Sequence, residues 1–186
     1  MKFKKLSVLF CSLLALTSVM AVSAAEAETV SETEAASEEE STASGADEET
    51  EYPITIQHAY GETVIESKPE RIATVGWENQ DTPLALGIAP VGVSAANYGM
   101  VTENNLHPWT DEAFQELGVD APNVFDDVDG LDFEAISDTN PDVILASYSG
   151  LTQEDYDTLT QIAPVIPYKE AAWQTTWREQ TIENAE

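Results

Sequence analysis

Two segments of the sequence share one design, and this design constrains the fold more than any other feature. Each is a short, continuous apolar run that ends in a loop with an aromatic residue: Ile72–Val75 leads to Trp77, and Val143–Ala146 leads to Tyr148. An unbroken apolar run of this length is typical of a strand covered on both faces, as in a parallel sheet. Open parallel sheets bind ligands at the carboxyl ends of their strands. The two aromatic loops therefore predict a binding edge.

Helical patterns follow the apolar runs along the chain and indicate an α/β fold built on a parallel sheet. Asp81 stands where a side chain that caps a helix N-terminus is found, Asp132 opens a further helix, and another starts at Thr152. An alternating pattern over 52–60, followed by Gly61, predicts a hairpin before the sheet. The expected helices cover 81–87, 110–118, 132–137, 152–162 and 177–185, and the further strands cover 90–94, 123–125 and 164–168.

The start of the chain reads as an export signal. Three lysines among the first five residues, a mostly apolar run over 6–22 and small residues at 23–25 predict a secretory signal peptide over 1–25. Cys11 is the only cysteine, and Phe10 precedes it where a lipoprotein signal carries a small residue. We therefore expect neither lipidation at Cys11 nor a disulfide in the mature chain.

Acidic residues dominate the rest of the chain and limit its partners. Residues 26–51 hold eleven acids, no base and no aromatic residue, which predicts an acidic disordered linker. Residues 52–186 carry 24 acids against four bases, a formal charge of −20. This charge repels phosphate backbones and anionic membrane surfaces, so nucleic acid is excluded as a partner. Neutral or cationic ligands suit the domain better than trianionic ones.

Aromatic side chains in loops are the strongest candidates for ligand contact. Trp77 and Trp109 lie in predicted loops, Trp173 follows a strand, and Tyr148 follows the second apolar run. Tryptophan in a loop is costly unless it covers apolar surface or a π-rich ligand. The alternative is that each ring packs its own loop onto the domain. Trp177 starts a predicted helix, and we expect its ring to pack in the same way. The polar candidates, which would add neutral hydrogen bonds at the same rim, are Asn79, Gln80 and Ser149.

The sequence contains no catalytic or metal-binding pattern. It lacks a glycine-rich phosphate loop, a G-x-S-x-G segment and metal-ligand spacing. Ser147 and Ser149 have no histidine near them in sequence. His58 is expected at the surface of the hairpin, and His107 is a weaker candidate for ligand contact. Arg71 precedes its strand, away from the binding edge, and is expected to pair with an acid.

Five fragments, taken in order, resemble a known family. They look like the amino-terminal lobe of the iron–siderophore and cobalamin substrate-binding proteins of ABC importers, and the resemblance covers about 54–168. Each fragment alone is weak, but five in the right order are specific. The fragments are Lys68–Ala73, Leu86–Val93, Gly130–Ile136, Asn140–Leu145 and Ile162–Val165.

The resemblance implies a two-lobed periplasmic-binding-protein fold in which a long helix joins the lobes and ligand lies between them. Residues 52–173 would form the Rossmann-like amino-terminal lobe, and 174–186 would begin the connecting helices. The second lobe would be absent, so we expect a fragment. The resemblance also implies that a glutamate on this lobe docks into the membrane permease, and Glu134 matches its position.

The function implied is that of an exported binding component, in the periplasm or at the cell surface, rather than an enzyme. It would bind a ferric siderophore and deliver it to an ABC permease, with no cofactor and no metal ligands of its own, because the siderophore holds the iron. The excess of acidic residues favours a hydroxamate siderophore, whose ferric complex is neutral or cationic, over a trianionic catecholate complex. The alternatives are cobalamin or haem on the same scaffold, or, from another class, an exported α/β hydrolase.

Overall fold

The computed structural model describes residues 50–185. The predicted signal peptide and almost all of the predicted linker fall outside these residues. Among residues 50–185, no helix is both long and apolar enough to cross a bilayer. The strands are β1 (Ile54–His58), β2 (Gly61–Ile65), β3 (Ile72–Thr74), β4 (Gly92–Ser94), β5 (Val124–Phe125), β6 (Val143–Ala146) and β7 (Val165–Pro167). The helices are α1 (Asp81–Ala85), α2 (Pro108–Glu116), α3 (Phe133–Asp138), α4 (Gln153–Leu159) and α5 (Trp177–Glu183).

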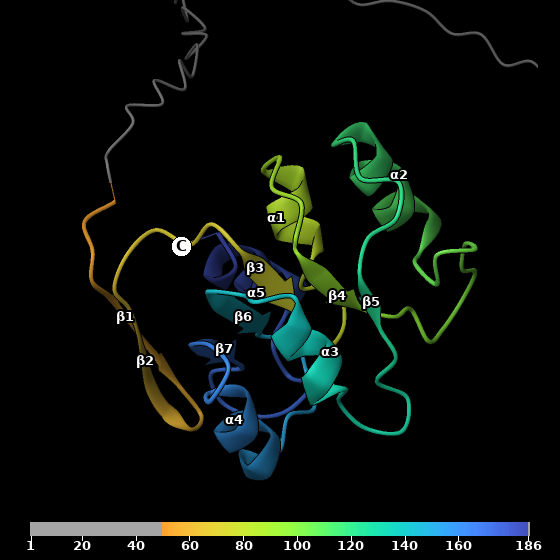
Figure 1. Cartoon of the computed structure of the whole chain (residues 1–186). Coiled ribbons are helices and arrows are strands. Elements are labelled where there is room, and N and C mark those ends of the chain that lie inside the picture. The colour runs from red at the N-terminus through yellow and green to blue at the C-terminus, as the bar shows by residue number, and fades with distance from the viewer. Residues whose placement is uncertain (1–49, 186) are drawn as a thin grey trace, which may run out of the picture. The chain divides into compact units, whose positions relative to one another are not determined.

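The main sheet is parallel throughout, as the apolar runs predict. Its strand order is β5-β4-β3-β6-β7, and β1 and β2 form a separate antiparallel hairpin (Figure 1). Thr74 of β3 pairs with Val93 on one side and with Leu145 on the other. From β3 the chain builds outward to β5, then returns to add β6 and β7 on the opposite side. The boundary between β3 and β6 is the switch point of an open sheet, where ligands bind.

Successive residues of β6 point to opposite faces of the sheet, so each face has its own core. Ile144 packs with Ile136 of α3 and Leu159 of α4. Val143 and Leu145 pack in a second cluster with the hairpin, through residues Ile56 and Ile65. A third cluster lies toward β4, where α1 and α2 cover the sheet through residues Leu84, Val93, Leu106 and Phe114.

Most of the predicted helix starts are confirmed. The Asp132 carboxylate accepts a hydrogen bond from the Ala135 amide at 2.9 Å, and Thr152 forms a capping box at the start of α4. Asp81 is not a cap: it is the first residue of α1 and follows the N-cap, Gln80. The second helix begins two residues before the predicted Thr110, because Pro108 has the backbone angle of a first helical turn and no amide to leave unpaired.

His58 is buried, which corrects the prediction that it lies at the surface. Its side chain is only 9% exposed, and Nε2 lies 2.9 Å from Thr63 Oγ1. The His58 ring also packs against Tyr156, with ring centroids 5.3 Å apart. In the alternating strand β1 this position faces the core together with Ile56. Burial lowers the pKa of His58, because the charged imidazolium loses hydration.

Arg71 pairs with no acid among residues 50–185, which corrects a second prediction. Its guanidinium donates to the backbone carbonyls of Thr139 and Asn140, just beyond the end of α3. The nearby acid, Asp142, instead accepts hydrogen bonds from the backbone amides of Glu70 and Arg71, at 2.8 and 3.0 Å. A cation at a helix C-terminus meets carbonyls that have no partner within the helix. Arg71 therefore fixes α3 to β3, at the end of the sheet away from the candidate site.

Candidate ligand-binding site

Backbone hydrogen bonds tie together the loops that follow β3, β6 and β7. The Trp77 amide donates to the Tyr148 carbonyl, and the Trp173 amide donates to the Ser149 carbonyl, both at 3.1 Å. Gly76 has a φ of +84°, and a Cβ at this position would lie 2.6 Å from the Tyr148 carbonyl oxygen. Glycine is therefore required where the two loops meet.

The side chain of Asn79 connects the loops after β3 and β6 through hydrogen bonds, and it has no exposed surface. Its Nδ2 donates to the carbonyls of Val75 and Tyr148, at 2.8 and 3.1 Å. Its Oδ1 accepts from the Ser147 hydroxyl at 3.0 Å and from the Tyr148 amide at 3.2 Å. Two side chains near the end of the chain, Gln180 and Asn184, also donate to Oδ1. The structure thus places this predicted ligand contact in the framework beneath the rim.

Above this framework six rings form a continuous row, which we call the aromatic row. Neighbouring ring centroids in it lie 4.4 to 5.4 Å apart. The ring of His107 is buried within the row, whereas Trp77, Tyr98, Trp109 and Trp173 are 36% to 53% exposed. The row runs in the order Trp109, His107, Tyr98, Trp77, Trp173 and Tyr148.

All four aromatic residues predicted from sequence lie in this row. Trp109 stands in the first turn of α2 and not in the predicted loop, because the helix begins at Pro108. Tyr98 is a member that sequence reasoning missed. It follows strand β4 as Trp77 follows β3, so the rule of an aromatic residue in the loop after a strand could have found it. Trp177 lies outside the row, 68% exposed at the start of α5, with the Arg178 guanidinium 4.6 Å from its ring centroid. It is not the packing residue that the sequence predicts.

The other polar candidates are largely engaged inside the protein. Gln80 is buried and donates to Asp81 Oδ1 at 3.1 Å. The Ser149 hydroxyl donates to the Ala146 carbonyl at 2.7 Å, and the Ser147 hydroxyl bonds to asparagine oxygens. Neither serine bonds to a histidine in the described part of the chain. The hydrolase alternative therefore finds no nucleophile and base here.

Two hollows flank Trp77. The larger has a volume of about 250 Å³, and its lining includes Trp77, Trp173, Asp127 and Asp155. The smaller, of about 20 Å³, lies on the side of Tyr98 and His107. Among the residues that the structure describes, no lysine or arginine lines either hollow. Exposed indole faces beside carboxylates suit a neutral or cationic ligand with apolar surface.

The acids around Trp77 are partly desolvated. Tyr98 Oη donates to Glu78 at 2.5 Å, and burial together with this hydrogen bond raises the pKa of Tyr98 to about 12. Burial, reinforced by the charge of Glu78, raises the pKa of Asp81 to about 6. Burial also raises the pKa of Asp127. Within residues 50–185, no group of three or more His, Cys, Asp or Glu side chains is arranged to hold a metal ion.

Glu134 does not line either of these hollows. It is exposed in the first turn of α3, directly after Phe133, and the helix is capped by Asp132. An acid in the first turn is stabilised by the helix dipole. The position is therefore open to contact by another molecule.

The sequence is similar to several known binding proteins. A family model described as periplasmic binding protein matches residues 72–186. The probable siderophore-binding lipoprotein YfiY of Bacillus subtilis is 28% identical over 172 residues, which cover 88% of this chain and 43% of that protein.

Two solved structures share the fold. The iron uptake substrate-binding protein PiaA of Streptococcus pneumoniae, in complex with ferrichrome, is 55% identical with a TM-score of 0.68, over 71% of this chain and 43% of that one. SirA of Staphylococcus aureus, complexed with staphyloferrin B, is 26% identical with a TM-score of 0.54, over 71% of this chain and 41% of that one. The chain spans less than half the length of the curated relatives it matches. The matched model nevertheless covers more than half of the chain, and the chain belongs to the periplasmic binding protein family.

Proposed function

We propose that this chain forms one lobe of an ABC-importer binding component that takes up a ferric siderophore. The observation that carries the proposal is the aromatic row at the switch point of the sheet, open to solvent and flanked by carboxylates. Its loops offer indole and phenol faces, which suit the apolar surface of a wrapped metal complex. The identity of 55% to a ferrichrome-bound protein supports the same conclusion.

The charge of the site favours a hydroxamate complex. Ferric tris-hydroxamates are neutral, whereas ferric tris-catecholates carry three negative charges and would meet Asp127 and Asp155 without a lysine or arginine in the hollow. The siderophore brings the iron with its own ligands, so the protein needs no metal ligands. The chain would be exported through its predicted signal peptide and would act at the cell surface or in the periplasm.

The test is a tryptophan-fluorescence titration of a full-length protein carrying this lobe. Ferrichrome should quench the fluorescence in a saturable way, and a ferric tris-catecholate should bind at least about tenfold more weakly because of charge repulsion. Cobalamin and haem serve as competitors from the same scaffold class. No quenching by any ferric complex in the panel would refute the siderophore proposal.

We further propose that Glu134 is a docking contact for the membrane permease. It is an exposed acid at a helix start, and a rim charge of this kind contributes orientation and association rate more than affinity. Glu134→Ala should leave ligand affinity unchanged and slow the uptake of ferric siderophore. The matched control is Glu154→Ala, because Glu154 is also exposed in the first turn of a helix. Equal uptake by the two variants would remove the docking role.

A further inference from the structure

The smaller of the two hollows that flank Trp77, which we call the small hollow, is lined by two residues with unusual buried polar atoms. These atoms are Nε2 of His107 and Oγ1 of Thr110, and neither has a hydrogen-bond partner among residues 50–185. His107 is only 5% exposed and Thr110 only 1%, so both side chains are shielded from bulk solvent. Buried polar groups in native proteins are usually bonded to protein or to an ordered water, because an unpaired one destabilises the fold.

The hydrogen bonding of the His107 ring determines what the small hollow must supply. Nδ1 lies 3.3 Å from the carbonyl oxygen of Met100, which can only accept, so Nδ1 carries the proton. In the neutral ring Nε2 is then an acceptor and needs a donor. Thr110 Oγ1 can both donate and accept. The two atoms therefore suit a small group that donates to His107 and shares a hydrogen bond with Thr110.

The size of the small hollow fits one water molecule. Its volume is about 20 Å³, and the centre of a single water requires roughly 10 to 15 Å³. A buried water makes about three hydrogen bonds to polar groups of the protein. Ser94 and Gln80 belong to the same lining and offer further polar atoms beside those of His107 and Thr110.

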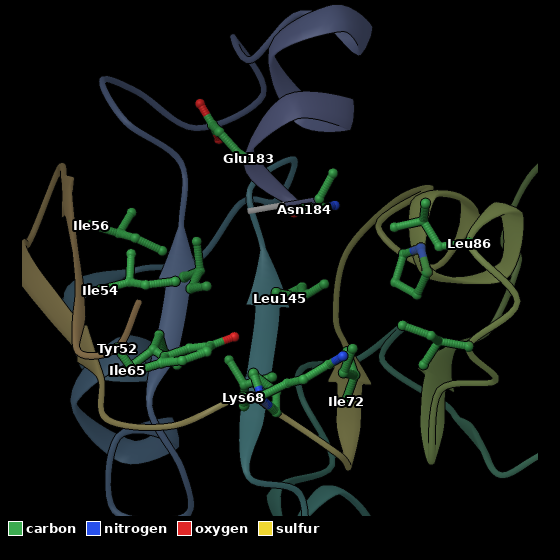
Figure 2. A pocket seen from close by; sticks show the side chains of 16 residues that line it. Tyr52, Ile54, Ile56, Ile65, Lys68, Ile72, Leu86, Leu145, Glu183 and Asn184 are labelled. Carbon is green, nitrogen blue, oxygen red and sulfur yellow. The ribbon is translucent and has the colours of Figure 1, made fainter. Parts of the chain in front are cut away.

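An apolar groove elsewhere on the chain shows the contrast. This groove, of about 140 Å³, lies on the sheet residues Ile72, Leu145 and Ile166, with the hairpin on one side and Leu86 at the end of α1 on the other (Figure 2). The side chains of its floor carry no polar atom. Water above this floor has no fixed partner, whereas the small hollow presents two buried ones.

We propose that the small hollow binds one water molecule that bridges His107 Nε2 and Thr110 Oγ1, and that Thr110 thereby positions the His107 ring in the aromatic row. The His107 ring stacks on Trp109, with centroids 4.4 Å apart, and packs against Tyr98 at 4.5 Å. Hydrogen bonds at both ring nitrogens fix the rotation of the imidazole, and the fixed imidazole supports the two exposed rings beside it. Thr110 is a positioning residue, and its role does not depend on which ligand the row binds.

The test is NMR spectroscopy of the full 186-residue chain without ligand, labelled with nitrogen-15 at histidine. The chain has two histidines, and His58 serves as the internal reference. The Thr63 hydroxyl donates to the Val165 carbonyl, so it accepts from His58 Nε2, while His58 Nδ1 accepts from the Tyr60 amide. We therefore expect His58 to carry its proton on Nε2 and His107 on Nδ1. Magnetisation from a long-lived water should reach the ring protons of His107.

Thr110→Val keeps the shape of the side chain and removes the hydroxyl. In this variant the water signal at His107 should fall by about fivefold or more, the Nε2 resonance should move to that of a nitrogen without a hydrogen bond, and the ring-current shift from Trp109 should change. Thr110→Ser should restore all three. The matched control is Thr74→Val: Thr74 Oγ1 is also buried without a partner in the described part of the chain, but Thr74 does not line the small hollow. This control should leave the His107 signals unchanged.

Three results would overturn the proposal. Equal water signals at His107 in the wild type and in Thr110→Val would show that no water bridges the two residues. Loss of the water with an unchanged ring-current shift would remove the positioning role. If Thr110→Val does not fold, the wild type still decides, because a missing water signal or a proton on Nε2 of His107 refutes the bridge. All of these measurements are made without ligand, so they stand whatever becomes of the siderophore proposal.

Discussion

The aromatic row and the apolar groove both expose apolar side chains, yet they are built in different ways. Most of the row stands on loops after strands, with Trp109 in the first turn of α2, and a buried asparagine connects the loops after β3 and β6. Carboxylates lie beside the rings. The groove lies on regular strands and is lined mainly by aliphatic side chains. Loops carry polar groups that can orient a small ligand, whereas a flat aliphatic face offers only packing. The row therefore suits a small ligand, whereas the groove offers only apolar packing surface.

The largest loss of stability should come from Asn79→Ala, in the framework beneath the aromatic row. The substitution leaves the Tyr148 amide without its acceptor, removes one of the two acceptors of the Ser147 hydroxyl, and removes the donor to the Val75 and Tyr148 carbonyls. We expect a loss of about 4 kcal/mol in the free energy of unfolding, measured by urea denaturation.

The control for Asn79→Ala is Asn123→Ala, which removes one exposed hydrogen bond, from Asn123 Nδ2 to the Val91 carbonyl. This variant should lose less than about 1 kcal/mol. Similar losses for the two variants would mean that Asn79 does not hold the loops of the aromatic row together.

A somewhat smaller effect is expected for Gly76→Ala. The new Cβ would lie 2.6 Å from the Tyr148 carbonyl oxygen, and the φ of +84° is strained for alanine. We expect a loss of about 3 kcal/mol in unfolding free energy. Gly87→Ala isolates the backbone strain, because Gly87 has a φ of +79° and nothing within 4 Å of an added Cβ. That variant should lose only about 1 kcal/mol. Equal losses would show that the close approach of the added Cβ to the Tyr148 carbonyl oxygen does not destabilise the fold.

Asp81→Asn should change how stability depends on pH. Burial raises the pKa of Asp81 to about 6 in the folded protein, above its ordinary value of 3.8. The ionised carboxylate is therefore less favourable in the folded state, and the contribution of Asp81 to stability falls as pH rises from about 4 to about 6. Asparagine should remove this loss and raise the unfolding free energy at pH 7.5 by about 1 kcal/mol. The gain is this small because solvent screens the charge of a partly exposed carboxylate. An unchanged difference between pH 4 and pH 7.5 would contradict this account.

The smallest change in unfolding free energy is expected for a substitution at the rim of the groove. Leu86 is 59% exposed, so Leu86→Ala should change the unfolding free energy of this chain by less than about 0.5 kcal/mol. Leu84→Ala is the buried comparison, since Leu84 lies in α1, two residues before the C-cap Leu86, and is 7% exposed; this variant should lose about 3 kcal/mol. A large loss at Leu86 would show that the groove is already closed by this chain.

The sequence predicted the parallel sheet and the rings near its switch point, because both follow from local patterns. A continuous apolar run identifies a covered strand, and an aromatic residue directly after it marks the loop, as for Trp77 and Tyr148. The internal role of Asn79 could not be predicted, since its partners at Tyr148 and Asn184 lie 69 and 105 positions away. The groove was also beyond prediction. Which face of a four-residue strand such as β6 is left uncovered depends on how the hairpin and α1 pack, and the run itself carries no sign of this.

The most direct test of the account compares two exposed tryptophans in a full-length protein that carries this lobe. Trp77 lies in the aromatic row, and Trp177 lies outside it with its own exposed face. Ferrichrome affinity is measured by isothermal titration calorimetry for Trp77→Ala, Trp177→Ala and the wild type. The account predicts that Trp77→Ala binds at least about tenfold more weakly, because it removes a central stacking face, and that Trp177→Ala binds like the wild type. Equal affinity of all three proteins would contradict the assignment of the aromatic row as the ligand site.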